Sequence, residues 1–131
     1  MTLSQIDSYF RGILAIEEFA RDDRSQNGIQ IARSDGDISH IAFAVDASLE
    51  TARRAAEWGA GLLVVHHGLF WGTSLPITGV HYGRVREFLE RDLALYAVHL
   101  PLDQHETLGN NAVMADRLQL EEREPFGEHH G

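Results

Sequence analysis

The chain has 131 residues, a length that predicts one domain, because domains average roughly 150 residues. Apolar residues make up 44% and charged residues 24% of the sequence, as in ordinary globular proteins, which excludes a fibrous or disordered chain. The formal net charge of −9 has the wrong sign for non-specific attraction to nucleic acid or anionic lipid. No apolar run reaches the roughly 18 residues of a membrane span, and the first residues lack a signal-peptide pattern. We therefore expect a cytoplasmic protein with neither a membrane nor a nucleic-acid partner.

Two residue types with distinctive chemistry are missing. The sequence contains no cysteine, which excludes disulfides, thiolate zinc sites, iron–sulfur clusters and cysteine nucleophiles. All 11 basic residues are arginine, which excludes a Schiff-base lysine and the lysine of a Walker A motif. Histidine is abundant, with 8 residues. A tight metal site in this chain has to be built from histidine, aspartate and glutamate.

The first part of the chain predicts a helix followed by two strands. Apolar residues recur at helical spacing over residues 3–19, which predicts an amphipathic helix. The polar stretch 21–28 ends in an Asn-Gly pair and is interpreted as a loop, and a short strand is expected over 28–32. Residues 40–45 form a nearly continuous apolar run, which predicts a strand buried on both faces of a sheet.

The rest of the chain alternates between helices and strands. Helices are predicted over 49–58, 81–91 and 110–118, strands over 62–66 and 93–99, and loops over 67–79 and 100–108. Ser48 is suited to cap the first of these helices and Gly59 to end it. The order is the βαβ pattern of an α/β fold, with a mostly parallel sheet covered by helices on both faces. We expect a single α/β domain over residues 1–131.

Each of the three predicted central strands is followed by a polar side chain suited to bind a ligand. Asp46 follows the first strand, His66 and His67 follow the second, and His99 and Asp103 follow the third. Ligands of open parallel sheets bind beyond the carboxyl ends of the strands. The sequence therefore predicts a site at this edge of the sheet.

The two adjacent histidines suggest a metal site. His66 and His67 would point to opposite faces of a regular strand, but Gly68 allows the backbone to turn so that both rings face one site. Such a pair suits two metal ions, with Asp103 able to bridge them. Paired ions polarise a substrate oxygen and activate water for hydrolysis. The alternative for the histidine pair is a purely structural role in the core.

Other residues near the strand ends have structural alternatives. Asp46 is favoured as a helix-start residue, the asparagines at 110–111 as caps of the last helix, and the aromatic pair 70–71 as either core or wall of the site. Pro101 argues against a helix over 99–103, so a loop is expected there. Four histidines are expected to be scaffold, surface or outer partners of the site: His40, His81, His129 and His130.

Four segments carry a resemblance to a known family. They are VVHHGLFWG at 64–72, LYAVHLPLDQHETLGNNAVMA at 95–115, SQNGIQI at 25–31 and AVDAS at 44–48. They resemble the interacting-factor-three-like family, also called domain of unknown function thirty-four, whose members carry the name GTP cyclohydrolase I type 2 homologue. The likeness extends over essentially the whole chain.

This resemblance implies a dinuclear site of Zn, Fe or Mn ions between two α/β halves, in a ring-shaped homohexamer. His66 and His67 match the paired metal-binding histidines of the family, and Asp103 matches its bridging aspartate. His99 is assigned to the site wall or to a weaker ligand. The remaining family ligands, a histidine and a glutamate four residues apart, are absent from this sequence. The chain therefore resembles the N-terminal half of a longer two-part protein.

The function implied is that of a metal-dependent hydrolase acting on a small molecule, with a purine nucleotide as the candidate substrate. In this hypothesis, His66, His67 and Asp103 hold the ions, and His99 or His105 acts catalytically by moving protons near neutral pH. The alternative is a non-catalytic protein that binds or handles metal, or forms a ring as an interaction module. In both cases the expected protein partner is a second copy of the chain.

Overall fold

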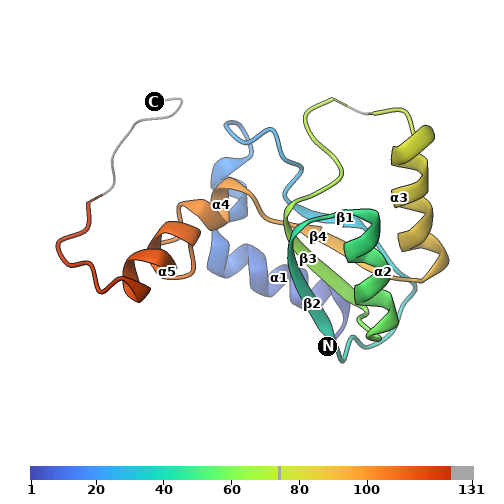
Figure 1. Cartoon of the computed structure of the whole chain (residues 1–131), viewed down its shortest axis with the longest axis horizontal. Helices are drawn as coiled ribbons and strands as arrows, with labels where there is room; N and C mark the ends of the chain where they lie inside the picture. The colour runs from blue at the N-terminus through green and yellow to red at the C-terminus, as the bar shows by residue number, and fades with distance from the viewer. Residues whose placement is uncertain (74, 125–131) are drawn as a thin grey trace.

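The structure, a computed structural model, describes residues 1–73 and 75–124. His129 and His130, expected at the surface or in the scaffold, lie outside the described residues. Figure 1 shows one sheet with helices on both faces, which confirms the predicted fold class. In chain order the elements are α1 (Leu3–Leu14), the 3-10 helix η1 (Ile16–Phe19), β1 (Gly28–Ile31), β2 (Ile41–Asp46), α2 (Leu49–Glu57), β3 (Leu62–His67), α3 (Gly79–Glu90), β4 (Ala94–Ala97), α4 (Leu100–Asp103) and α5 (Asn110–Arg117).

The sheet has the strand order β1-β4-β3-β2. Strand β3 pairs in parallel with β2 and with β4, whereas β1 pairs antiparallel with β4. In this register Asp46 lies opposite His67 and Val65 lies opposite Ala97. The carboxyl ends of β2, β3 and β4 therefore meet at one edge of the sheet, as the sequence predicts.

Two apolar cores form, one on each face of the sheet. Ala52 of α2 and Phe88 of α3, both fully buried, belong to the core on the first face. Ile6 of α1, Ile16 of η1 and the fully buried Tyr96 belong to the core on the second face. Alternation along β3 and β4 divides their side chains between these cores, so both strands are held on both faces.

The prediction that residues 40–45 are buried on both faces is wrong. Strand β2 lies at the edge of the sheet, and the side chains of Phe43 and Val45 are 71% and 61% exposed. On their face of the sheet, α1 packs over β1 and β4 and leaves Phe43 and Val45 uncovered. Apolar periodicity predicts a strand, but it does not give the strand's place in the sheet.

Two helical segments differ most from the prediction. The first helix ends at Leu14, because Ala15 adopts a left-handed conformation with φ of 47°, and a 3-10 turn follows. Residues 100–103, predicted as loop, form one helical turn with Pro101 in its first positions. Proline is tolerated there because the first N–H groups of a helix have no intrahelical partner.

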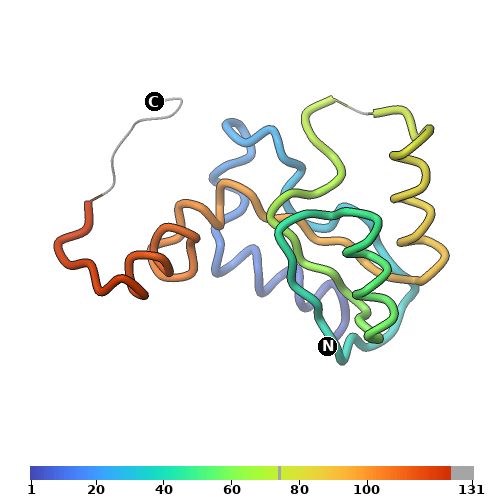
Figure 2. The backbone as a smooth tube through the Cα atoms, viewed as in Figure 1, coloured from blue at the N-terminus to red at the C-terminus, as the bar shows by residue number. Residues whose placement is uncertain are grey.

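Helix α5 packs least against the rest of the chain. None of its side chains is buried, and Met114 in the helix and Leu118 directly after it are each 62% exposed. The backbone trace in Figure 2 shows α5 standing apart from the sheet, joined to it through α4. Within residues 1–73 and 75–124, no helix combines the length and the hydropathy needed to cross a membrane.

A buried tyrosine connects the sheet to α1. The hydroxyl of Tyr96 donates a hydrogen bond of 2.9 Å to Oδ1 of Asp7, and Asp7 also accepts from Nε of Arg11 at 3.0 Å. Burial raises the pKa of the Tyr96 hydroxyl above its usual value, and the hydrogen bond and charge of Asp7 raise it further. The protonated phenol is therefore the form that the folded state stabilises.

We expect Tyr96→Phe to lower the free energy of unfolding by about 1.5 kcal/mol at neutral pH, because it removes a hydrogen bond to a charged group. The raised pKa of Tyr96 also makes the free energy of unfolding depend on pH. The stability that Tyr96 contributes is complete below about pH 10, where the unfolded tyrosine is protonated, and falls as the pH rises further. Urea unfolding between neutral pH and about pH 11 should therefore show a steeper alkaline decline for the wild type than for Tyr96→Phe.

The chain suits this measurement because it has no lysine and no cysteine to titrate in the alkaline range. Tyr9→Phe is the matched control, since Tyr9 is 59% exposed, and it should leave the free energy of unfolding at neutral pH nearly unchanged. Identical alkaline slopes for the wild type and Tyr96→Phe would contradict the interpretation.

Candidate metal centre

Three histidine rings converge at the carboxyl edge of the sheet. His66 and His67 end β3, and His99 follows β4 and immediately precedes α4. The ring centroids lie 4.6 Å apart for His66 and His67, 4.9 Å for His66 and His99, and 5.8 Å for His67 and His99. One ring nitrogen from each histidine lies within 4.8 Å of those of the other two. The adjacent histidines thus face one site in spite of the alternation along the strand.

The hydrogen bonds of the three rings define their tautomers. Nδ1 of each ring contacts an oxygen that can only accept: His66 contacts the Val98 carbonyl at 3.0 Å, His67 contacts Oδ1 of Asp46 at 2.8 Å, and His99 contacts Oδ1 of Asp23 at 3.0 Å. The proton of each neutral ring therefore lies on Nδ1, which donates it to the oxygen. Each Nε2 keeps the lone pair that a metal ligand needs.

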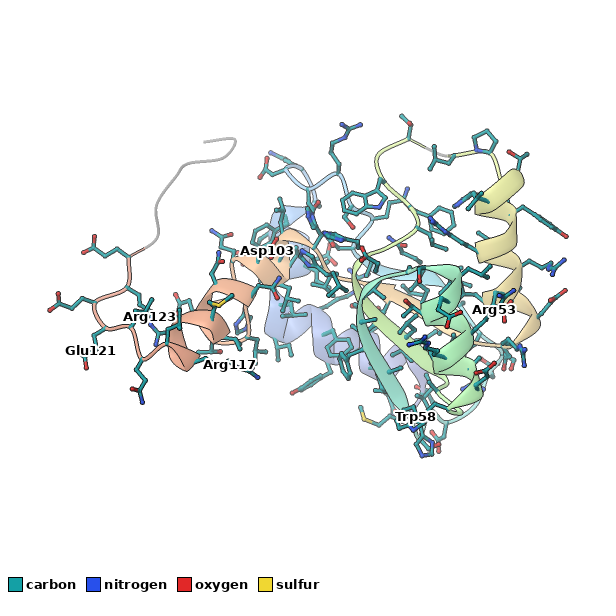
Figure 3. The ribbon with its side chains drawn as sticks, viewed as in Figure 1. Arg53, Trp58, Asp103, Arg117, Glu121 and Arg123 are labelled. Atoms are coloured by element: carbon teal, nitrogen blue, oxygen red, sulfur yellow. The ribbon has the colours of Figure 1, made fainter. Side chains whose placement is uncertain are left out.

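Asp103 brings a carboxylate to the same site. Its Oδ2 lies 3.4 Å from Nε2 of His66, and its Oδ1 accepts a hydrogen bond of 2.9 Å from Nδ2 of Asn110. Figure 3 shows Asp103 on α4, at the side of the sheet from which α5 leads away. The expectation that Asn110 caps the last helix is wrong, because Gly109 occupies the cap position and the Asn110 side chain holds the carboxylate instead.

The donor set fits a divalent cation. Neutral imidazole nitrogens and carboxylate oxygens are ligands that Zn²⁺, Fe²⁺ and Mn²⁺ accept. Three carboxylates, those of Asp23, Asp46 and Asp103, each lie within 3.4 Å of a ring nitrogen of the cluster. Negative charge around neutral imidazoles favours a cation at their centre. The structure therefore supports the expectation that this cluster could hold a metal ion.

Asp23 is a residue of the site that sequence reasoning misses. Its side chain is 1% exposed. Burial acts to raise the pKa of Asp23, but hydrogen bonds from Asn27, His99 and two backbone amides outweigh burial and hold the pKa below its usual value. The composition of the polar stretch 21–28 predicts only a loop. The paired aspartates and the asparagine inside it are the available signal.

The aromatic pair after β3 has both of the roles considered. Phe70 packs against the core on the α2 and α3 face. Trp71 lies edge-on to the ring of His99, with centroids 4.9 Å apart, and its Nε1 donates to the Gly68 carbonyl at 3.0 Å. Trp71 therefore lines the site, and Phe70, the residue before it, packs in the core.

Gln30 of β1 holds the loop that carries this pair. Its Oε1 accepts hydrogen bonds from the amides of Leu69 at 2.7 Å and Phe70 at 3.2 Å. Its Nε2 donates to the carbonyls of Gln26 at 2.9 Å and Phe70 at 3.2 Å. A Cβ at Gly68 would overlap the amide group of Gln30, so a larger residue here would require that group to move.

The structure does not bring His105 into the cluster. Its Nε2 donates to the Ile13 carbonyl at 3.0 Å, and its Nδ1 accepts from the backbone amides of Thr107 and Leu108. With both nitrogens engaged by the backbone, His105 joins the turn after α4 to the end of α1. The proton-transfer role expected for it receives no support from this position.

Asp46 differs from its expected role, whereas His81 takes the scaffold role expected for it. Asp46, expected to begin a helix, is the partner of His67, while Ser48 caps α2 as predicted, with its hydroxyl accepting from the Thr51 amide at 3.0 Å. His81 packs edge-on against Phe70, away from the three-histidine cluster. The residues brought together are thus His66, His67, His99 and Asp103, with Asp23 and Asp46 as their outer partners.

Comparison with known proteins identifies the family. The sequence model of Duf34/NIF3 (NGG1p interacting factor 3) matches residues 1–131. A protein of Treponema pallidum named GTP cyclohydrolase 1 type 2 homolog is 49% identical over 127 residues, which cover 97% of this chain and 44% of that protein. A protein of the same name from Halobacterium salinarum is 46% identical over 131 residues, which are all of this chain and 51% of that protein.

Solved structures agree with this. TTHA1606 from Thermus thermophilus superposes with a TM-score of 0.90 at 39% identity, covering 96% of this chain and 51% of that one. Reduced HcgD from Methanocaldococcus jannaschii superposes with a TM-score of 0.81 at 27% identity, covering 95% of this chain and 50% of HcgD. The chain thus spans about half the length of the relatives that it matches, and the resemblance drawn from the sequence is confirmed. The chain belongs to the Duf34/NIF3 family.

Proposed function

We propose that this chain supplies the metal-binding half of a metal-dependent hydrolase. The observation that carries the proposal is the convergence of three imidazoles with Nδ1 already committed, beside the carboxylate of Asp103. A site with ligands preset in this way loses little conformational freedom when an ion binds. Relatives named GTP cyclohydrolase 1 type 2 homolog make a purine nucleotide, and GTP first, the substrate to test.

The residues of the site have two proposed roles, metal binding and proton transfer. His66, His67 and Asp103 hold the metal, and His99 either completes the ligand set or transfers a proton. A divalent ion held there would act as a Lewis acid that polarises a substrate oxygen and lowers the pKa of water. The side chain of His67 is 45% exposed, so solvent and substrate reach the site from that side. Trp71 closes the side next to His99.

The proposal includes a second ion and assembly of several copies, both of which depend on the remainder of the protein. The relatives are about twice as long as this chain. In the dinuclear hypothesis, a histidine and a glutamate from outside residues 1–131 complete the second ion's ligands. The exposed apolar side chains of α5, among them Val113 and Met114, support a contact with another part of such an assembly.

We expect residues 1–131 alone to bind one divalent ion per chain, because the residues that the structure describes bring together three histidines and a single carboxylate, Asp103, that faces a free Nε2. Isothermal titration of the metal-free chain with Zn²⁺ or Mn²⁺ measures this number. Two tightly bound ions per isolated chain would contradict the proposed division of ligands.

Turnover by the whole protein tests the reaction itself. The metal-loaded protein should release formate from GTP, and removal of the metal by a chelator should stop the release. Absence of turnover while the metal is retained would overturn the hydrolase proposal for GTP and leave the metal-binding role, which is the second candidate.

A further inference from the structure

We propose that Asp23 is the positioning residue of this site, one carboxylate that orients the ring of His99 and, through the first turn of α4, the carboxylate of Asp103. The inference rests on the proposed metal-binding function and extends it to a residue that is not itself a ligand. Asp23 lies in the loop between η1 and β1, 76 positions before His99 in the sequence.

Each carboxylate oxygen of Asp23 accepts two hydrogen bonds, one from its own loop and one from His99 or Leu100. Oδ1 accepts from the backbone amide of Ser25 at 2.8 Å and from Nδ1 of His99 at 3.0 Å. Oδ2 accepts from Nδ2 of Asn27 at 2.7 Å and from the backbone amide of Leu100 at 2.9 Å. A buried carboxylate that accepts four hydrogen bonds has very little freedom to rotate, because any rotation breaks bonds that water cannot replace.

The main chain of His99 is held by the same loop. The amide of His99 donates a hydrogen bond of 2.8 Å to Oδ1 of Asn27, whose Nδ2 in turn donates to Asp23. His99 is therefore fixed at two points, its amide and its ring. With Nδ1 committed to Asp23, Nε2 is the nitrogen presented to the cluster.

The same carboxylate supports the start of α4. The first N–H groups of a helix lack intrahelical acceptors, and His99, at the cap position, makes no side-chain hydrogen bond to them. Asp23 supplies the missing acceptor for the amide of Leu100. Asp103 lies on this turn, with its amide bonded to the carbonyl of His99 at 3.1 Å. Movement of Asp23 would therefore displace two members of the site together.

Asp46 provides a natural comparison within the same site. It makes the equivalent bond to Nδ1 of His67, at 2.8 Å, but its side chain is 66% exposed, whereas that of Asp23 is 1% exposed. Water can replace an exposed partner, and solvent screens its charge. Loss of Asp46 should therefore cost the site less than loss of Asp23.

The test uses the full chain with Asp23→Asn and with Asp46→Asn as its matched control. Nitrogen-15 NMR of the metal-free proteins, at about pH 8.5 where ordinary histidines are neutral, reports the tautomer of His99. We expect the Nδ1–H tautomer in the wild type and in Asp46→Asn, and its loss or mixing in Asp23→Asn. An unchanged His99 tautomer in folded Asp23→Asn would overturn the inference.

Titration with Zn²⁺ adds the functional readout. Asp23→Asn should weaken the affinity for Zn²⁺ by about 10- to 100-fold, the range known for outer partners of histidine ligands, and Asp46→Asn by less than about 10-fold. Equal losses in the two variants would overturn the inference. Failure of the wild type to bind Zn²⁺ would instead overturn the proposed function, while the metal-free tautomer still tests Asp23.

A measurement on the wild type covers the case in which Asp23→Asn does not fold. The Nδ1 proton of His99 is shielded by its buried partner, whereas that of His67 faces an exposed one. The His99 proton should therefore exchange with water more slowly than the His67 proton. Faster or equal exchange at His99 would contradict the role given to Asp23.

Discussion

Replacement of His66 by alanine should weaken the binding of Zn²⁺ by at least about 100-fold, more than loss of an outer partner costs. The side chain of His66 is the least exposed of the three histidines, at 13%. Its ring centroid lies 4.6 Å and 4.9 Å from those of the other two, and its Nε2 lies 3.4 Å from Oδ2 of Asp103. Its removal takes away a nitrogen ligand and leaves the carboxylate of Asp103 without its neighbour. Isothermal titration and metal analysis of the purified protein measure the effect.

His40→Ala is the control for this prediction. His40 is an exposed histidine that packs against Trp58, so the same substitution there removes an imidazole without touching the cluster. It should leave the metal content unchanged. If His66→Ala combined with Asp103→Ala also kept the wild-type metal content, the cluster would be a purely structural group of histidines.

Gly68→Ala should lower the free energy of unfolding by about 1–3 kcal/mol, the usual range for an added methyl group that forces a packed neighbour to move. The new Cβ would displace the amide group of Gln30, which makes three hydrogen bonds to the backbone of Leu69 and Phe70 and one to the Gln26 carbonyl. Each lost bond costs about 0.5–1.5 kcal/mol. Urea unfolding measures the stability, and the fluorescence of Trp71, which this loop carries, reports the change near the site.

Gly83→Ala is the control, because it makes the same substitution where the added methyl group has no close neighbour. Gly83 lies inside α3, and a Cβ there would meet no atom within 4 Å, so alanine should stabilise the helix by up to about 1 kcal/mol. The two substitutions are therefore expected to act in opposite directions. Equal stabilities for Gly68→Ala and Gly83→Ala would mean that the contact with Gln30 does not constrain the loop.

The location of the candidate site could be predicted from the sequence because its main residues follow strands whose patterns are local. His66, His67 and His99 each come at the end of an apolar run, and the rule that parallel strands end at one edge brings these ends together. The capping of α2 by Ser48 is equally local, since a cap acts within three residues of itself.

The features that the sequence does not predict mostly depend on contacts between segments far apart in the chain. The partnership of Asp23 with His99 joins positions 76 apart, and Gln30 reaches the Phe70 carbonyl across 40 positions, so no periodicity reveals either. The edge position of β2 follows from the strand order, which a pattern along one strand does not contain. The turn of α4 escapes prediction because Pro101 usually breaks a helix, although a first helical position accepts proline.

The central place of β3 has a consequence for how the site withstands local unfolding. Strand β3 is hydrogen-bonded to neighbours on both sides, so His66 and His67 belong to the segment that opens last, together with the whole sheet. Helix α5, with no buried side chain, belongs to the segments that open first. Opening of α5 leaves the histidine pair in place and frees Asn110 from Asp103. For the proposed metal site we therefore expect an ion to enter or leave on the side of Asp103 without global unfolding, at a rate set by the opening of the least stable part of the fold.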